Sequence, residues 1–248
     1  MKRFEGKNMI ITGTSKGIGK ALVSYFSAEG ARIAAVSRSI PESKEKDVYH
    51  IQADIEERDK ILDLSSEYFG GTADILINNA GIICYETLLE VTQQQLDQVF
   101  QTNVISTLLL SQSLAKRLIA DKRGGVIVNT LSFAVTIPSV GSGIYAASKS
   151  ALASLTRTMA AEWAPFGIRV NGYSPGVVET DMTRPAIEKN KEAMVDAIAL
   201  HEIASVDQMT KIVGFLASED SAYLTGVNLD ASGGKFIVQN AGAAWKET

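Results

Sequence analysis

The stretch N-M-I-I-T-G-T-S-K-G-I-G, residues 8–19, decides the fold of this chain. Residues 8–12 form the short apolar run that a buried parallel strand needs. A glycine-rich turn follows at once, and apolar residues then recur at helical spacing over residues 17–29. This order of strand, glycine turn and helix predicts a parallel α/β sheet whose first turn meets a nucleotide.

The glycines of this turn, Gly13, Gly17 and Gly19, suit a pyrophosphate ligand. Glycine lets the backbone approach closely, and the helix N-terminus offers N–H groups and a partial positive charge. The G-x-x-x-G-x-G spacing differs from the commoner G-x-G-x-x-G dinucleotide fingerprint. The alternative is a loop that binds nothing, but the flanking strand and helix favour the nucleotide.

The end of the second predicted strand, residues 32–36, indicates which dinucleotide binds. An Asp or Glu there hydrogen-bonds the ribose hydroxyls of NAD, whereas a nearby Arg accommodates the 2′-phosphate of NADP. This chain has neutral Ser37 followed by cationic Arg38, and Lys16 adds a positive charge in the glycine turn. We therefore predict NADP(H) rather than NAD(H); the alternative is that both cations are simply solvated.

Strand and helix patterns alternate to the end of the chain and predict a Rossmann-like, doubly wound parallel sheet of about seven strands with helices on both faces. Strands are expected at 8–12, 32–36, 48–51, 74–77, 125–131, 168–173 and 226–230, and helices at 17–29, 57–69, 92–120, 145–163 and 206–217. The 248 residues are expected to form one domain. Within it, residues 38–48 should form a loop or one helical turn, 183–205 a helix-and-loop lid, and 235–248 a C-terminal tail.

Composition excludes several classes of function. The net charge of −4, without a basic run, argues against nucleic acid and membrane-surface partners. No stretch approaches the ~20 apolar residues of a membrane span or forms the core of a signal peptide. One cysteine, Cys84, excludes an internal disulfide and fits a reducing cytoplasm. Cys84 and the distant His50 and His201 give no metal-site spacing, so no metal is expected.

Tyr145 and Lys149 stand four residues apart in Y-A-A-S-K, on the predicted helix 145–163. Residues at this spacing share one helix face, with Cβ atoms about 5–6 Å apart. An ammonium so close favours the phenolate, so we expect Lys149 to lower the pKa of Tyr145 from about 10. Tyr145 could then act as a general acid or base near neutral pH. Alone this motif is common on surface helices, and the other motifs give it weight.

Together these motifs resemble the short-chain dehydrogenase/reductase family in its single-domain form, over nearly the whole chain. The glycine turn is similar to the family's cofactor loop, and Asp54 to the acidic residue that meets the adenine. N-N-A-G at 78–81 resembles the motif that closes the fourth strand beside the adenosine. Ser132 lies thirteen residues before Tyr145, the family's usual interval. S-P-G-V-V-E-T at 174–180 resembles the segment that holds the nicotinamide carboxamide.

The resemblance implies a catalytic tetrad of Asn103, Ser132, Tyr145 and Lys149. Ser132 would hydrogen-bond the carbonyl oxygen, and Tyr145 would give that oxygen a proton or take one in the reverse direction. Lys149 would also hold the nicotinamide ribose, and Asn103 a water that links Lys149 to solvent. The residues expected to bind the cofactor are Gly13, Ser15, Lys16, Gly17, Ile18, Gly19, Ser37, Arg38, Asp54, Ile55, Asn79, Ala80, Gly81, Tyr145, Lys149, Pro175, Gly176, Val178 and Thr180.

We therefore predict an oxidoreductase that transfers a hydride between NADP(H) and a small-molecule carbonyl or secondary alcohol. Within this class, a 3-oxoacyl-thioester reductase competes with a sugar, polyol or steroid dehydrogenase. A non-catalytic NADP-binding regulatory protein is the alternative from another class, because fold alone does not fix function. Such a sensor has no need of a complete tetrad. Substrate choice should rest on the lid and on residues 84–88 and 133–142 across the cleft.

An acyl carrier protein is a possible partner, but two departures from the related reductases weaken the case for it. The chain is similar to 3-oxoacyl-acyl-carrier-protein reductases, yet it has A-L-H-E at 199–202 where they usually have a P-L-G-R-like stretch. Phe166 takes the position of an arginine that often helps to dock the carrier. An apolar Phe166 and an acidic Glu202 do not suit an anionic carrier. A basic group remains at the end of the long helix: Lys116, Arg117, Lys122 and Arg123.

The resemblance also implies a homotetramer, because the family usually pairs its two long helices across a two-fold axis. Helices 92–120 and 145–163 are rich in small and apolar residues for surface elements. The alternative is that these stripes face only the sheet. The apolar tail from Phe236 to Trp245 needs a burial site, and the cleft of a neighbouring subunit is one candidate.

Overall fold

The computed structural model describes residues 2–42, 45–181, 183–235 and 237–246. Its centre is a parallel sheet of seven strands in the order β3-β2-β1-β4-β5-β6-β7. The strands are β1 (Asn8–Thr12), β2 (Arg32–Ser37), β3 (Val48–Gln52), β4 (Ile75–Asn78), β5 (Gly125–Thr130), β6 (Ile168–Pro175) and β7 (Asn228–Ala231). The predicted doubly wound parallel sheet is confirmed, with some strand ends displaced by one or two residues.

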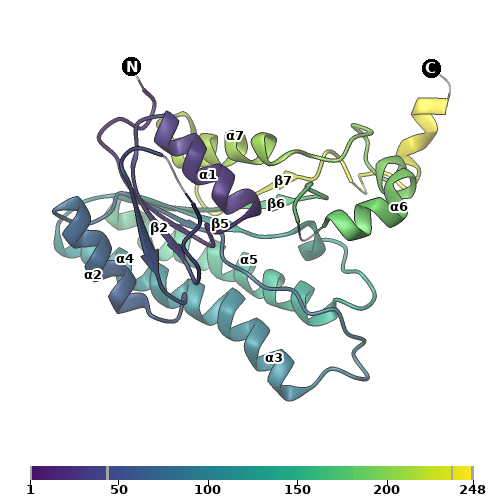
Figure 1. Cartoon of the computed structure of the whole chain (residues 1–248), viewed down its shortest axis with the longest axis horizontal. Coiled ribbons are helices and arrows are strands. Elements are labelled where there is room, and N and C mark those ends of the chain that lie inside the picture. The colour runs from purple at the N-terminus through teal and green to yellow at the C-terminus, as the bar shows by residue number, and fades with distance from the viewer. Residues whose placement is uncertain (1, 43–44, 182, 236, 247–248) are drawn as a thin grey trace.

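Helices cover both faces of this sheet (Figure 1). One face carries α1 (Gly17–Ala28) and α7 (Val206–Ala217), and the other carries α2 (Arg58–Phe69), α4 (Thr107–Ala120) and α5 (Gly143–Trp163). Each face buries an apolar core, with Leu22 and Phe26 of α1 on one side and Leu110 and Leu114 of α4 on the other. Helix α6 (Arg184–Asp196) stands apart from both layers, beside the C-terminal segment (Figure 1).

The single helix predicted over residues 92–120 was wrong in one respect. The structure has α3 (Gln93–Phe100), then a π-helical turn at Gln101–Ser106, then α4. Asn103 sits in this wider turn, is fully buried, and exchanges two hydrogen bonds of 2.9 Å with the backbone of Ile82. A π turn adds one residue to a continuous helix and has no residue type of its own that marks it, so the sequence alone did not reveal it.

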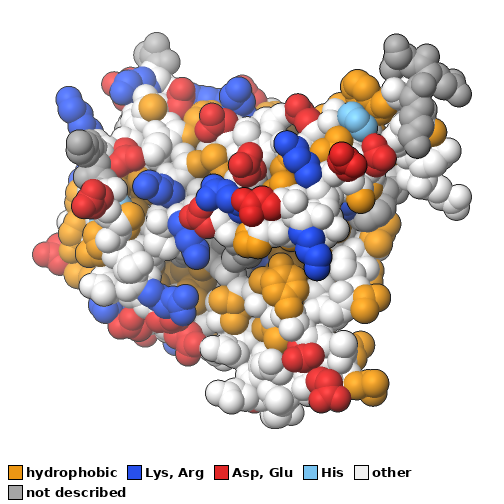
Figure 2. All heavy atoms as spheres, turned by 45° about the vertical axis from the view of Figure 1, so that its right-hand side comes forward, with side chains coloured by type: hydrophobic (Ala, Val, Ile, Leu, Met, Phe, Trp, Pro, Cys, Tyr) orange, Lys and Arg blue, Asp and Glu red, His pale blue; other side chains and the backbone are white. Residues whose placement is uncertain are grey.

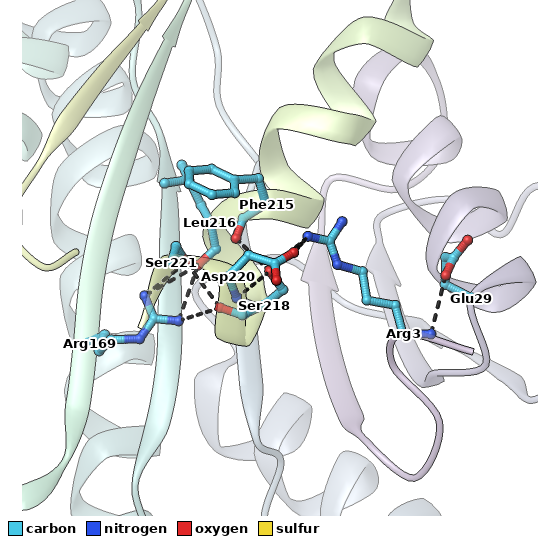
Figure 3. Close-up of polar contacts among 8 residues, drawn as sticks. All are labelled: Arg3, Glu29, Arg169, Phe215, Leu216, Ser218, Asp220 and Ser221. Carbon is cyan, nitrogen blue, oxygen red and sulfur yellow. Dashed lines mark hydrogen bonds and ion pairs between the residues drawn. The ribbon is translucent and has the colours of Figure 1, made fainter. Parts of the chain in front are cut away.

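Arg169 of β6 fastens the C-terminal end of α7 to the sheet (Figure 3). Its guanidinium donates to the carbonyl oxygens of Leu216 and Ser218, at 3.4 and 3.0 Å, and to the hydroxyl of Ser221 at 3.2 Å. The last carbonyls of a helix have no intrahelical partner, so a cation stabilises them. Arg3 pairs with Asp220 beside this cluster (Figure 3). These contacts fix β6, whose other end reaches the site.

The predicted loop, lid and tail are only partly described. Of the predicted loop 38–48, Val48 belongs to β3, no helix or strand occurs in the described part of 38–47, and positions 43–44 lie outside the described residues. The lid region 183–205 contains α6 and loops, with Ala204 in an isolated bridge to Val178. The described tail, 237–246, ends in a 3-10 turn at Ala241–Lys246 beside α6 (Figure 1); Phe236 and positions 247–248 lie outside the described residues. Among the helices in the described ranges, none is long and apolar enough to cross a membrane.

Candidate active site

A cavity of about 690 Å³ lies at the carboxyl ends of the strands. Ligands of parallel sheets bind at this edge. Its wall includes residues that follow β1 to β6, together with the first turns of α1 and α5. Figure 2 brings the α6 side of the molecule forward, where hydrophobic side chains border a hollow and basic side chains gather on its opposite side.

Every residue predicted to bind the cofactor lines this cavity. Two members of the predicted tetrad, Tyr145 and Lys149, line it as well. The other two, Ser132 and Asn103, are not in the lining of the cavity. Each lies next to a lining residue, Ser132 next to Tyr145 and Asn103 next to Gly81. Motifs that are more than a hundred residues apart in the sequence therefore meet in one place.

Two glycines of the turn, Gly13 and Gly19, leave no space for a side chain. A Cβ at Gly13 would lie 2.8 Å from the Cα of Ala80, and one at Gly19 would lie 2.1 Å from the carbonyl oxygen of Gly13. Asn79 holds the turn, because its Nδ2 donates to the carbonyls of Thr12 and Gly13 at 3.1 Å. The Thr12 hydroxyl accepts the N–H groups of Asn79 and Ala80. Sequence reasoning missed this role of Thr12, whose signal was a hydroxyl at the end of an apolar strand.

These residues fit a dinucleotide phosphate. Helix α1 begins at Gly17, which has a φ of +57°, and its N-cap, Lys16, makes no side-chain capping bond. Gly17, Ile18 and Gly19 line the cavity, so first-turn N–H groups border it. Uncapped amides at a helix N-terminus attract a pyrophosphate through hydrogen bonds and the helix dipole.

The end of β2 carries a cation to the cavity and no carboxylate. Ser37 is buried, and its hydroxyl donates to the carbonyl of Ser39 at 2.8 Å. Arg38 is exposed on the cavity wall, and the amide of Gln52 holds its carbonyl at 3.1 Å. Lys16, also exposed, lines the same cavity. Two carboxylate side chains, Asp54 and Glu56, line this cavity as well.

Tyr145 lies in the first turn of α5 and hydrogen-bonds Ser132. Burial raises the pKa of Tyr145, the hydrogen bond with Ser132 partly opposes this rise, and nearby Tyr85 adds to it. The prediction that Lys149 lowers the pKa of Tyr145 was therefore wrong for this structure. The Lys149 ammonium lies 5.9 Å from the centre of the Tyr145 ring, and loss of hydration, rather than this ammonium, sets the direction of the pKa shift.

The buried ammonium of Lys149 donates to the main-chain carbonyl of Thr130 at 2.7 Å. Burial lowers the pKa of Lys149 to about 8, so the side chain remains mostly protonated at neutral pH. Gly81 leaves room for it, because a Cβ there would lie 3.4 Å from Nζ and 3.3 Å from the Oδ1 of Asn103. Sequence reasoning missed Thr130, and no side-chain signal could have revealed a contact made by a main-chain carbonyl.

Asn103 ties three segments of the site together. Besides Ile82, its Nδ2 donates to the hydroxyl of Ser148, at 3.0 Å, on the turn of α5 that carries Lys149. The π-helical turn thus links the segment after β4 to the helix of the predicted tyrosine and lysine. The predicted role of Asn103 in holding a water stays a prediction.

Comparison with known proteins places the chain in one family. The family model for short chain dehydrogenases matches residues 7–191. The 3-oxoacyl-acyl-carrier-protein reductase FabG of Vibrio cholerae is 31% identical over 246 residues, which cover 95% of this chain and 99% of that protein. The similarity therefore extends across both chains almost completely.

Solved structures agree in fold and differ in cofactor. A 4-hydroxyisoleucine dehydrogenase complexed with NADH has a TM-score of 0.87 and 27% identity, over 94% of this chain and 100% of that one. An Agrobacterium tumefaciens protein assigned as a 2-deoxy-D-gluconate 3-dehydrogenase, with bound NADP, has a TM-score of 0.85 and 28% identity, over 94% and 98%. The fold alone therefore does not choose between the two cofactors.

Proposed function

Because the chain belongs to the short-chain dehydrogenase family of oxidoreductases, we propose that it transfers a hydride between NADP(H) and a small-molecule carbonyl or secondary alcohol. The observation that supports this most is that Tyr145 and Lys149 line the same cavity as the glycine turn. A proton donor and a nucleotide-binding turn are thus close enough to act on one substrate and one cofactor.

The residues divide the chemistry between them. The cofactor, when bound, supplies or accepts the hydride. Tyr145 carries a proton on Oη at neutral pH, since burial raises its pKa, and gives it to the substrate oxygen in the reducing direction. Ser132 hydrogen-bonds that oxygen as negative charge develops. Lys149, held by Thr130, binds the nicotinamide ribose in the space that Gly81 leaves.

Oxidation of NADPH in the presence of a panel of ketoses, steroid ketones, oxo acids and 3-oxoacyl thioesters tests the proposed function. We expect turnover with at least one compound class and much less with Tyr145→Phe. Tight binding of NADPH without turnover of any compound would instead favour a regulatory nucleotide-binding protein.

A 3-oxoacyl-thioester reductase is the second candidate, and the similarity to FabG favours it. The contacts of the basic group at the end of α4 argue against a thioester that is attached to an acyl carrier protein. Arg117 pairs with Asp63, and Arg123 pairs with Asp74, so half of the predicted group is already neutralised. Phe166 is exposed, as a docking position should be, but it carries no charge. A free thioester suits the site better than an anionic carrier.

We also propose that the protein is a homotetramer. The surface face of α5 presents small side chains at helical spacing, Ala147, Ser150 and Ser154, and Ile105 of the π-helical turn is 43% exposed. Small residues let two helices approach closely across a two-fold axis. Light scattering should give the mass of four chains, and Ser154→Arg should lower it. A monomer at micromolar concentration would contradict this proposal.

The segment 183–205 is proposed to be a lid whose loop is held by the C-terminal tail. The Trp245 indole donates to the carbonyl of Ala199 at 3.0 Å and stacks on His201, with ring centres 4.9 Å apart. Ala241 and Gly242 are buried beside α6. The described tail therefore contacts its own chain, but Ile237, Val238 and Trp245 stay 64%, 55% and 49% exposed. Contact of these side chains with a neighbouring subunit stays a prediction.

Trp245→Ala is expected to raise KM and to speed amide hydrogen exchange over residues 184–201, because the lid loop loses a stacking partner and a hydrogen bond. Trp245→Phe keeps the ring but not the N–H, and should fall between the native protein and Trp245→Ala. Unchanged exchange in Trp245→Ala would show that the tail does not restrain the lid.

A further inference from the structure

Ser174, near the end of β6, contacts the segment that carries Ser132. Its side chain is buried, and its hydroxyl donates to the main-chain carbonyl of Ser132 at 3.0 Å. Ser174 is not in the lining of the cofactor cavity, so it is not placed to touch the cofactor or a substrate. The predicted cofactor residues of this segment begin at Pro175, which leaves Ser174 without an assigned role.

The chain leaves the sheet directly before Ser132. Strand β5 ends at Thr130, whereas its neighbour β6 runs further. The N–H of Leu131 still donates to the carbonyl of Tyr173 at 2.8 Å, as the next bond of the ladder would. At Ser132 the ladder has ended, and the hydroxyl of Ser174 makes the contact between the two segments instead. A side chain therefore takes over from the main-chain ladder at this residue.

Hydrogen bonds hold Ser132 at both of its oxygen atoms. Its carbonyl oxygen accepts the N–H of Val135, at 3.0 Å, besides the hydroxyl of Ser174. A carbonyl oxygen has two lone pairs, so these two bonds use its full capacity. Its Oγ accepts the N–H of Ala134 at 3.1 Å and is hydrogen-bonded to Tyr145. The contacts of the carbonyl thus fix the backbone from which the side chain reaches Tyr145.

A second contact of Ser174 makes its possible roles separable. Its hydroxyl also lies 2.8 Å from the Oδ1 of Asn228, on β7. A hydroxyl has one hydrogen, so the two oxygens compete for it. The contact with Asn228 ties β6 to β7, whereas the contact with Ser132 reaches the candidate active site. Loss of the Asn228 side chain removes the first contact and leaves the second.

We propose that Ser174 is a positioning residue, which holds the Ser132 carbonyl so that the Ser132 hydroxyl points at the substrate oxygen beside Tyr145. This inference rests on the proposed function, because the substrate carbonyl must lie between Ser132 and Tyr145. A hydrogen-bond donor stabilises developing charge best when it is aimed at the oxygen before the reaction begins. Loss of the Ser174 hydroxyl keeps the Ser132 side chain but frees its backbone to move.

The kinetics of single and double variants test the inference. We expect Ser174→Ala to lower kcat by about 10- to 100-fold, as a small misplacement of a reacting group does, and to leave the dissociation constant of NADPH unchanged. Ser132→Ala should lower kcat by about 10²- to 10³-fold. The double variant should be no slower than Ser132→Ala, because Ser174 acts only through the Ser132 hydroxyl. A serine with a merely structural role would give losses that multiply.

Asn228→Ala is the matched control. It removes the other partner of Ser174, on an exposed residue of β7, and should keep the native kcat. Ser174→Thr keeps the hydroxyl and should retain most of the rate. Ser174→Cys, which has only a weak S–H donor, replaces Ser174→Ala if the thermal midpoint shows that the latter does not fold. A loss in Asn228→Ala equal to that in Ser174→Ala would assign the effect to the contact between β6 and β7, against the inference.

A measurement without turnover separates this inference from the proposed function. The protein is labelled with ¹³C at the Cζ atoms of tyrosine, and the NMR signal of Tyr145 is identified by its absence from Tyr145→Phe. We expect Ser174→Ala to move this signal in the same direction as Ser132→Ala does, because both weaken the hydrogen bond between Ser132 and Tyr145. Asn228→Ala should leave the signal at its native position.

A loss of kcat in Ser174→Ala that disappears in the Ser132→Ala background supports the inference, and so does the shared movement of the Tyr145 signal. If no compound is turned over but the Tyr145 signal still depends on Ser174, the proposed function fails and the positioning contact stands. A native kcat and a native Tyr145 signal in Ser174→Ala would overturn the inference, even with NADPH-dependent reduction observed. Losses that multiply in the double variant would overturn it as well.

Discussion

Replacing Tyr145 by Phe is expected to lower kcat for carbonyl reduction by about 10²- to 10⁴-fold, the usual contribution of a positioned general acid. The Phe ring fills the same space at the start of α5, so the fold and the cofactor cavity stay intact. Only the hydroxyl is lost, and with it the hydrogen bond to Ser132 and the proton for the substrate oxygen. The NADPH dissociation constant should therefore change little.

Steady-state kinetics and calorimetric NADPH binding check this prediction together. Tyr68→Phe, on α2 and outside the cavity, is the matched control and should keep the native kcat. Lys149→Ala should behave differently and damage both rate and NADPH binding, because Lys149 faces the predicted ribose site beside Gly81. Turnover of Tyr145→Phe within tenfold of the native protein would mean that another group supplies the proton.

Replacing Arg38 by Asp is expected to weaken NADPH binding by about 10- to 100-fold and to narrow or invert the preference for NADPH over NADH. Arg38 is exposed on the cavity wall after β2, where its charge can meet a 2′-phosphate. A carboxylate at this position would repel that phosphate and accept hydrogen bonds from the free ribose hydroxyls of NADH instead.

Calorimetry with both cofactors measures this preference. Lys211→Asp makes the same change of charge on α7, away from the cavity, and should leave both affinities at their native values. Related structures hold NADH in one case and NADP in another, so the fold does not predict which cofactor this protein prefers. The two dissociation constants measure that preference directly. Equal affinities of the native protein for NADH and NADPH would contradict the assignment.

The sequence predicted the sheet well because its strands are buried on both faces. Central strands such as Ile75–Asn78 read as short apolar runs, and glycines or helical spacing mark their ends. The residues expected to bind the cofactor come together for a related reason, since most of them lie at or just after a strand end or in the first turn of a helix. Parallel strands bring such positions to one edge of the sheet, and the cavity at that edge contains them all.

The features that could not be predicted depend on backbone atoms or on burial. The π-helical turn around Asn103 is a change in backbone hydrogen bonding that no residue type marks in the sequence. Lys149 donates to the main-chain carbonyl of Thr130, and because every residue type has such a carbonyl, the sequence gives no sign of this contact. The pKa of Tyr145 depends on how much water the folded protein removes, and helical spacing to Lys149 does not give that amount. The stacking of Trp245 on His201 joins two loops without regular periodicity.

Transfer of deuterium from labelled NADPH tests the central claim most directly. The protein is incubated with NADPH that carries deuterium on one or the other face of C4, together with the carbonyl panel, and the alcohols are analysed by mass spectrometry. We predict an alcohol with one deuterium on its carbinol carbon, from one of the two labelled cofactors only, and far less of it with Tyr145→Phe. No deuterated alcohol from any compound with either label, despite bound NADPH, would contradict the proposed hydride transfer.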